Sequence, residues 1–177
     1  PLFLFMFACM FFTATTELTT TQWIEKLLGQ AGANALLILA LVNGLMAAGR
    51  FFGEGLIHKL SPQGVLLGSS IFAVIGLYLL QTTSGGMLYV AAIIFAGGVC
   101  FFWPTMLGFV NENIPKSGAM GLSLMGGMGM FGNGAYQTFF IGPKLDELQK
   151  SGMSEQLAGQ NVLASITLFP IILVIAF

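Results

Sequence analysis

Residues 126–134 read GGMGMFGNG, and within them Gly127, Gly129 and Gly132 match the pattern G-x-G-x-x-G. This pattern binds the pyrophosphate of a dinucleotide only when a strand precedes it, a helix follows it and an acidic residue lies about twenty residues further on. Here it lies inside a long apolar segment with no strand before it. We therefore interpret the stretch as part of a membrane-spanning helix. Small residues four apart, such as Ser123 and Gly127, share a face of such a helix and allow close helix packing in lipid.

The composition of the whole chain indicates a membrane protein. Of its 177 residues, 56% are hydrophobic and only 7% are charged, whereas soluble domains carry about 25% charged residues. The net charge of -1 leaves no basic patch that would predict nucleic-acid binding. The chain holds a single histidine, and both cysteines lie in apolar runs. We therefore predict no metal site and no cofactor, and we expect a protein that is not an enzyme.

Six apolar stretches are long enough, or nearly long enough, to cross a bilayer as helices, which takes about 20 residues. They cover about residues 1–23, 33–52, 64–80, 87–110, 118–141 and 161–177. The connectors place three basic residues on each side of the membrane, so the positive-inside rule does not decide the orientation. The chain begins without methionine and stops inside an apolar run, and we therefore expect a piece of a longer protein.

Glu17 lies within a predicted span, whereas the other acidic residues lie in connectors or at span ends. A carboxylate at the bilayer centre costs about 2.5–3.5 kcal/mol on insertion scales, so such residues usually face a cavity. Thr20 shares its helical face, and Gln22 and Trp23 follow closely. The alternative is a solvated loop after a shorter first span. A helix that ended at Ala14 would reach only about 21 Å of the roughly 30 Å hydrocarbon core, which favours the cavity.

Other polar residues inside the spans either bridge helices or contact a solute. Asn43 lies in the middle of the second span, where a buried amide needs a partner. Pro104 should kink the fourth span and free a backbone carbonyl inside the membrane. Its neighbours Trp103 and Thr105 either pack or line a cavity at this bend. The candidate solute contacts are Glu17, Gln22, Trp23, Asn43, Trp103, Thr105, Asn133 and Gln137.

A candidate ion pair follows the second span. Arg50 and Glu54 lie four residues apart in GRFFGEG, residues 49–55, so they can pair on one helical face at the membrane edge. Such a pair either anchors the end of a helix or holds one conformation of a moving protein. In the second case the two residues would form a gate.

The stretch GRFFGEGLIHKLSPQG, residues 49–64, resembles a connector of major facilitator superfamily transporters. In that family the connector carries a degenerate copy of the motif G-x-x-x-D-R-x-G-R-R. Part of it is present here, without the Asp-Arg core, in Gly49, Arg50, Gly53, Glu54 and Lys59. FFWPTMLGF (101–109) and LSLMGGMGMFG (122–132) are similar to two spans of the fucose-permease-like sugar:proton symporters.

This resemblance implies an all-α integral membrane fold in which the six spans are helices 7–12, the C-terminal half of a twelve-helix transporter. A missing N-terminal six-helix half would pack against them in the lipid bilayer around a central cavity. The expected function is secondary active transport of a small polar solute such as a sugar, by alternating access and coupled to protons, in a bacterial inner membrane. Arg50 and Glu54 would help to close the cytoplasmic end, and Glu17 would contact the proton or the solute. The alternatives are a lipid-modifying membrane enzyme and a non-transporting structural subunit.

Overall fold

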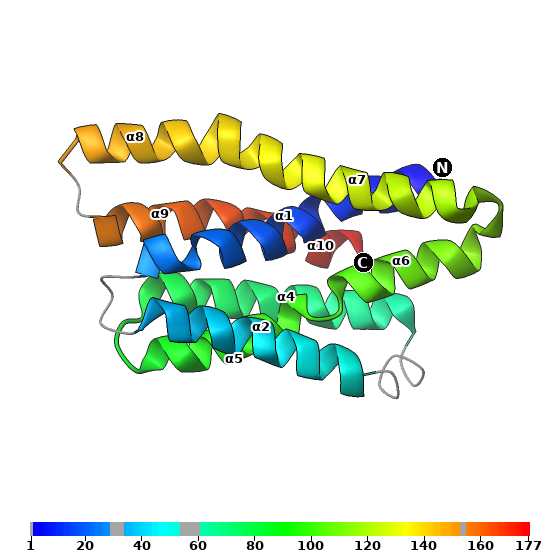
Figure 1. The fold of residues 1–177 in the computed structure, drawn as a ribbon, viewed down its shortest axis with the longest axis horizontal. Helices are drawn as coiled ribbons and strands as arrows, with labels where there is room; N and C mark the ends of the chain where they lie inside the picture. The colour runs from blue at the N-terminus through cyan, green and yellow to red at the C-terminus, as the bar shows by residue number, and fades with distance from the viewer. Residues whose placement is uncertain (1, 29–33, 54–60, 153–154) are drawn as a thin grey trace.

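The structure, a computed structural model, describes residues 2–28, 34–53, 61–152 and 155–177. These residues form an all-α bundle in which the helices run roughly along one common axis (Figure 1). Within these ranges the chain forms no strand. The main helices are α1 (Leu2–Leu28), α2 (Ala35–Phe52), α4 (Pro62–Thr82), α5 (Met87–Val99), α6 (Phe102–Asn113), α7 (Gly118–Tyr136), α8 (Gly142–Lys150), α9 (Glu155–Ile166) and α10 (Leu168–Ala176). A 3₁₀ turn, η1 (Pro115–Ser117), precedes α7, and a π-helical turn, η2 (Gln137–Ile141), joins α7 to α8.

Five helical segments are long and apolar enough to cross a membrane, which defines a multi-pass membrane protein. They are Leu2–Ile24, Ala35–Phe52, Pro62–Thr82, Met87–Asn113 and Leu157–Ala176. The predicted span at 118–141 is helical, but it is not one of the five. Seven of the 19 residues of α7 are glycine, and they dilute its apolar content. That this segment also crosses the membrane, as a sixth span, stays a prediction.

Two of the helices begin at capping residues that follow local rules. The Asn34 side chain accepts a hydrogen bond from the Leu37 N–H at the start of α2. The Ser61 side chain does the same for the Gly64 N–H at the start of α4, where Pro62 occupies the first turn. Short polar side chains satisfy N–H groups that have no partner within the helix, and proline fits the first turn because it has no N–H to satisfy.

Glycines allow close helix contacts, but not all of the glycines that we expected. A Cβ atom at Gly129 would lie 2.9 Å from the Ala14 Cβ, and one at Gly132 would lie 2.6 Å from the Phe11 ring. These two glycines let α7 pack directly against α1. The face with Ser123 and Gly127 is exposed instead, and a Cβ at Gly127 would meet nothing within 4 Å. Within the described bundle this face packs against no other helix, because α7 turns its other small residues toward α1, and the packing role of this face stays a prediction.

The fourth predicted span is broken where the proline predicts a kink. Helix α5 ends just before Cys100, and α6 begins just after Phe101. Pro104 has no N–H, so it cannot bond to the Cys100 carbonyl four residues earlier. The Thr105 N–H makes the next helical bond, to the Phe101 carbonyl at 3.1 Å. The predicted kink and the predicted free carbonyl are both confirmed.

Candidate functional site

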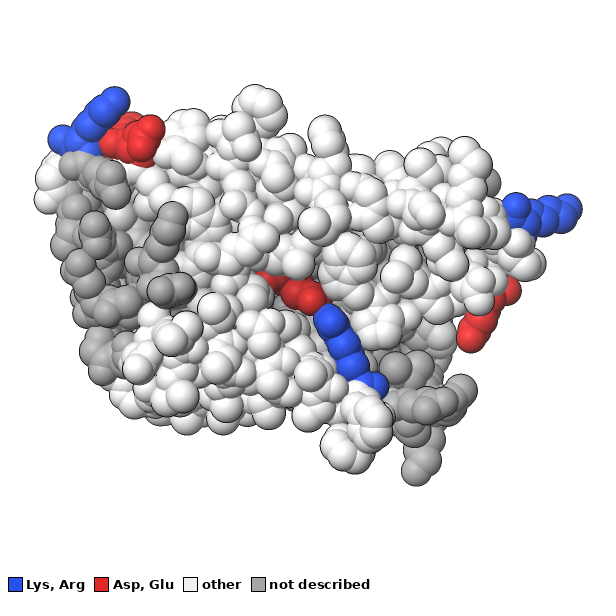
Figure 2. Space-filling view, viewed as in Figure 1, with Lys and Arg blue, Asp and Glu red and all other residues white. Residues whose placement is uncertain are grey.

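An ion pair joins helices α1 and α2 of the apolar bundle. Nη2 of Arg50, in α2, donates to Oε1 of Glu17, in α1, at 2.8 Å. The Glu17 side chain is 6% exposed and the Arg50 side chain 38%. Figure 2 shows one adjoining acidic and basic pair in the middle of this face, apart from the charges near the two ends. Glu17 is therefore a buried residue of a continuous helix, and the loop alternative for this stretch is wrong.

Arg50 makes a second contact at the broken helix. Its Nε donates to the Cys100 carbonyl at 2.9 Å. The partner that we expected from sequence, Glu54, lies outside the described residues, so the predicted gate pair stays a prediction. Sequence reasoning missed Glu17 as the partner because it considered only neighbours on one helix. The sequence nevertheless indicated this partner. Arg50 is the one arginine of the chain, and Glu17 is the one acidic residue within a predicted span. Charges in a low-dielectric interior are normally paired.

Four of the predicted contact residues form one hydrogen-bonded network that joins α1 to the end of α7 and the start of η2. Asn133 Nδ2 donates to Gln22 Oε1 at 3.2 Å. Gln137 Nε2 donates to Asn133 Oδ1 at 2.9 Å and also to Gln22 Oε1. Trp23 Nε1 donates to Gln137 Oε1 at 3.1 Å. Thr19, which was not among the predicted contact residues, also belongs to the network, because its hydroxyl donates to Asn133 Oδ1 at 2.8 Å.

The network lies where the helical geometry of α7 changes. Gln137 is the first residue of the π-helical turn η2. The neighbouring Tyr136 donates its hydroxyl hydrogen to Ser165 Oγ in α9 at 3.1 Å, which ties the same region to a third helix. Single π-helical turns within α-helices occur frequently at functional sites. The amide-rich patch therefore lies next to a locally widened helix.

Several buried polar atoms near these helices have no hydrogen-bond partner among the described residues. They are Glu17 Oε2, Thr20 Oγ1, Trp103 Nε1 and Thr105 Oγ1. The Trp103 ring packs close to Gly129, where a Cβ would lie 2.9 Å from its Cη2. Buried polar groups are normally satisfied by protein or water. These atoms therefore have hydrogen-bonding capacity left for water or a solute.

Asn43 differs from the other predicted contacts because it lies on an exposed face. Its Nδ2 donates to the Leu39 carbonyl of the same helix at 2.9 Å. Only 22% of the α2 span is buried, against 44–56% for the other four candidate spans. In the described bundle the Asn43 amide makes this bond within its own helix and bridges no second helix. A role in contacting a solute stays a prediction.

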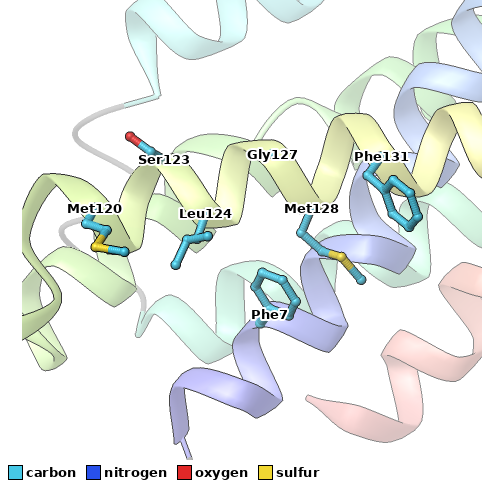
Figure 3. A pocket seen from close by; sticks show the side chains of 7 residues that line it. All are labelled: Phe7, Met120, Ser123, Leu124, Gly127, Met128 and Phe131. Atoms are coloured by element: carbon cyan, nitrogen blue, oxygen red, sulfur yellow. The ribbon is translucent and has the colours of Figure 1, made fainter.

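A pocket of about 420 Å³ lies elsewhere, between the first half of α1 and α7 (Figure 3). Its lining is almost entirely apolar and contains none of the predicted contact residues. The lining residues are Phe7, Met120, Ser123, Leu124, Gly127, Met128 and Phe131. Such a surface suits hydrocarbon rather than a polar solute. Over the residues that the structure describes, no three His, Cys, Asp or Glu side chains come together to hold a metal ion.

The fold and the site define the chain as a helical multi-pass membrane protein with a polar helix–helix network and an ion pair whose carboxylate is buried. Comparisons with protein-family models, with curated proteins and with solved structures find no match. The more specific assignment therefore depends on the sequence motifs and on the chemistry of the site.

Proposed function

We propose that the chain is the C-terminal six-helix half of a major facilitator transporter, which moves a small polar solute by alternating access coupled to protons. The observation that carries this proposal is the Glu17–Arg50 pair, which joins two apolar helices at 2.8 Å. Well-packed apolar residues usually hold helices together at least as well as a buried ion pair does. Ionisable residues within membrane spans most often mark pathways for ions, protons or solutes. We therefore assign the pair a role in transport.

The pair has the chemistry needed to couple a proton to a conformational change. Glu17 Oε1 accepts from Arg50, while Oε2 has no partner among the described residues. A proton added to this carboxylate removes its charge, which weakens its attraction for the guanidinium. The link between α1 and α2 is then loosened. Proton binding would in this way favour one arrangement of the helices over another.

The amide network between α1 and Asn133 and Gln137 supplies groups that suit a hydroxylated solute. The side chains of Gln22, Asn133 and Gln137 both donate and accept hydrogen bonds, as sugar hydroxyls do. Trp23 adds an aromatic ring next to them, bonded through its indole N–H to Gln137. An apolar ring beside a few oriented polar groups is typical of small-molecule sites. A neutral polyol or sugar is therefore the class of solute that we propose.

Open helix faces are available for the missing half. A Cβ atom at Gly44 in α2, or at Gly127 or Gly134 in α7, would meet nothing within 4 Å. Small residues on an uncovered face allow another helix to approach closely in lipid. We propose that the N-terminal half packs on these faces in a bacterial inner membrane and completes the cavity over Arg50.

The test is proton movement driven by solute. The natural protein is reconstituted into vesicles that contain a pH-sensitive dye, and a panel of monosaccharides and polyols is added outside. We expect at least one solute to drive proton entry, and we expect Glu17→Gln to abolish it. Glu112→Gln is the matched control, because Glu112 is an exposed carboxylate at the end of α6. Proton entry that persists unchanged in Glu17→Gln would contradict the role of the pair, and a panel without any transported member would contradict the solute class.

A further inference from the structure

We infer that Pro104 is a positioning residue for Arg50, because the N–H that proline lacks leaves the Cys100 carbonyl free to hold the arginine. The consequence for transport rests on the function proposed above. The contact itself does not, and it can be tested separately.

The missing bond can be identified from the chain geometry. In an α-helix the N–H of residue 104 would bond to the carbonyl of residue 100. Pro104 has no N–H, and the helix is interrupted at Cys100 and Phe101. A carbonyl without a partner is costly in a bilayer interior, where no bulk water can satisfy it. Here the partner is the Arg50 side chain, whose Nε lies 2.9 Å from the Cys100 oxygen.

The end of α2 is built to lie against this break. A Cβ atom at Gly49 would lie 2.6 Å from the Cys100 Sγ, so a larger residue would push the two segments apart. The Cys100 thiol also donates to the Met46 carbonyl at 3.5 Å. Met46, Gly49 and Arg50 thus bring the last turns of α2 against the free carbonyl. Contact at three positions argues against a chance approach of one long side chain.

Anchoring at Nε determines where the rest of the guanidinium points. The group is planar, and its N–H donors form a rigid fork. With Nε held on the Cys100 carbonyl, Nη2 reaches Glu17 Oε1 at 2.8 Å. Pro104 therefore acts on Glu17 through two steps, a free carbonyl and an oriented arginine. An alanine at 104 would supply an N–H that competes with Arg50 for the same oxygen.

Solid-state NMR on the natural protein in lipid bilayers tests the contact directly. Arginine is labelled with ¹⁵N in its guanidinium, and cysteine is labelled with ¹³C at its carbonyl. Arg50 is the only arginine of these 177 residues, and Cys100 is one of two cysteines. The dipolar coupling between the two labels reports their distance. A signal that disappears in Arg50→Lys is assigned to Arg50.

We expect the coupling in the natural protein, its loss in Pro104→Ala and its retention in Pro170→Ala. Pro170 is the matched control, because it is also a proline beside a break, between α9 and α10. Retention of the full coupling in Pro104→Ala would overturn the inference. Absence of the coupling in the natural protein would overturn it as well, and this result needs no variant to fold.

Solute-driven proton entry then tests the positioning role. We expect it to fall about tenfold in Pro104→Ala, the effect of losing one hydrogen bond to a charged group, and to persist in Pro170→Ala. Lost coupling with unchanged transport in Pro104→Ala would overturn the positioning role. If the natural protein shows the NMR coupling but transports nothing, the proposed function fails while the contact between Arg50 and Cys100 stands.

Discussion

Removing the charge of Arg50 should destabilise the protein more than removing the charge of Glu17. In Arg50→Gln, the Glu17 carboxylate loses its counter-charge while it is only 6% exposed. Removing one partner of a buried pair in this way costs about 3–5 kcal/mol. In Glu17→Gln, Arg50 keeps its bond to the Cys100 carbonyl, and its side chain is 38% exposed. The loss is then that of one charge-assisted hydrogen bond whose donor is partly exposed to solvent, about 1–2 kcal/mol.

Thermal unfolding in detergent measures this asymmetry. A thiol-reactive dye reports unfolding, because Cys9 and Cys100 are both buried in the folded chain. For a chain of this size, 1 kcal/mol corresponds to about 2–4 °C in Tm. We therefore expect Tm to fall by roughly 6–20 °C in Arg50→Gln and by roughly 2–8 °C in Glu17→Gln. The double variant should be more stable than Arg50→Gln alone, because no unpaired charge remains.

The opposite order of the two single variants would refute this reasoning, since it would mean that Arg50 rather than Glu17 is the enclosed charge. Equal losses would also refute it. Strictly additive losses in the double variant would show that the two side chains do not interact in the folded protein.

Three further predictions concern packing and the polar groups. Gly76→Ala should lower the unfolding free energy by about 1–3 kcal/mol, because its Cβ would lie 2.5 Å from backbone atoms of α5. The control is Gly68→Ala in the same helix, which has open space and should raise Tm slightly through helix propensity. Equal Tm values for the two variants would contradict the close contact at Gly76. Asn133→Leu removes the acceptor of the Thr19 hydroxyl. It should raise the Kd of the transported solute about tenfold or more in a binding titration. An unchanged Kd would exclude the network from the solute site. In the 177-residue chain alone, Asn43→Leu should change the unfolding free energy by less than about 0.5 kcal/mol, because Asn43 is exposed and bonds within α2. A clear loss on thermal unfolding would mean that another helix of this same chain covers Asn43.

Much of the local structure could be predicted from the sequence, because a bilayer requires long apolar helices. The prediction of a span at 33–52 agrees with α2 at Ala35–Phe52, and the prediction at 64–80 lies within α4. The break before Pro104 is equally local, since it follows from one missing N–H. The polar character of the α1 face with Glu17 could be predicted for the same reason, because residues three and four apart share a helical face.

The partners of these residues were decided only by the tertiary structure. Gln22 and Asn133 are 111 residues apart in the chain, and Arg50 and Glu17 are 33 residues apart. Spans that are apolar on most sides carry little information about which face turns inward, so the rotation of each helix depends on how its neighbours pack. This is why Gly129 and Gly132 contact α1 while Gly127 stays open. The sequence by itself determined helices, a kink and a buried charge, whereas packing decided that the kink and the charge meet at Arg50.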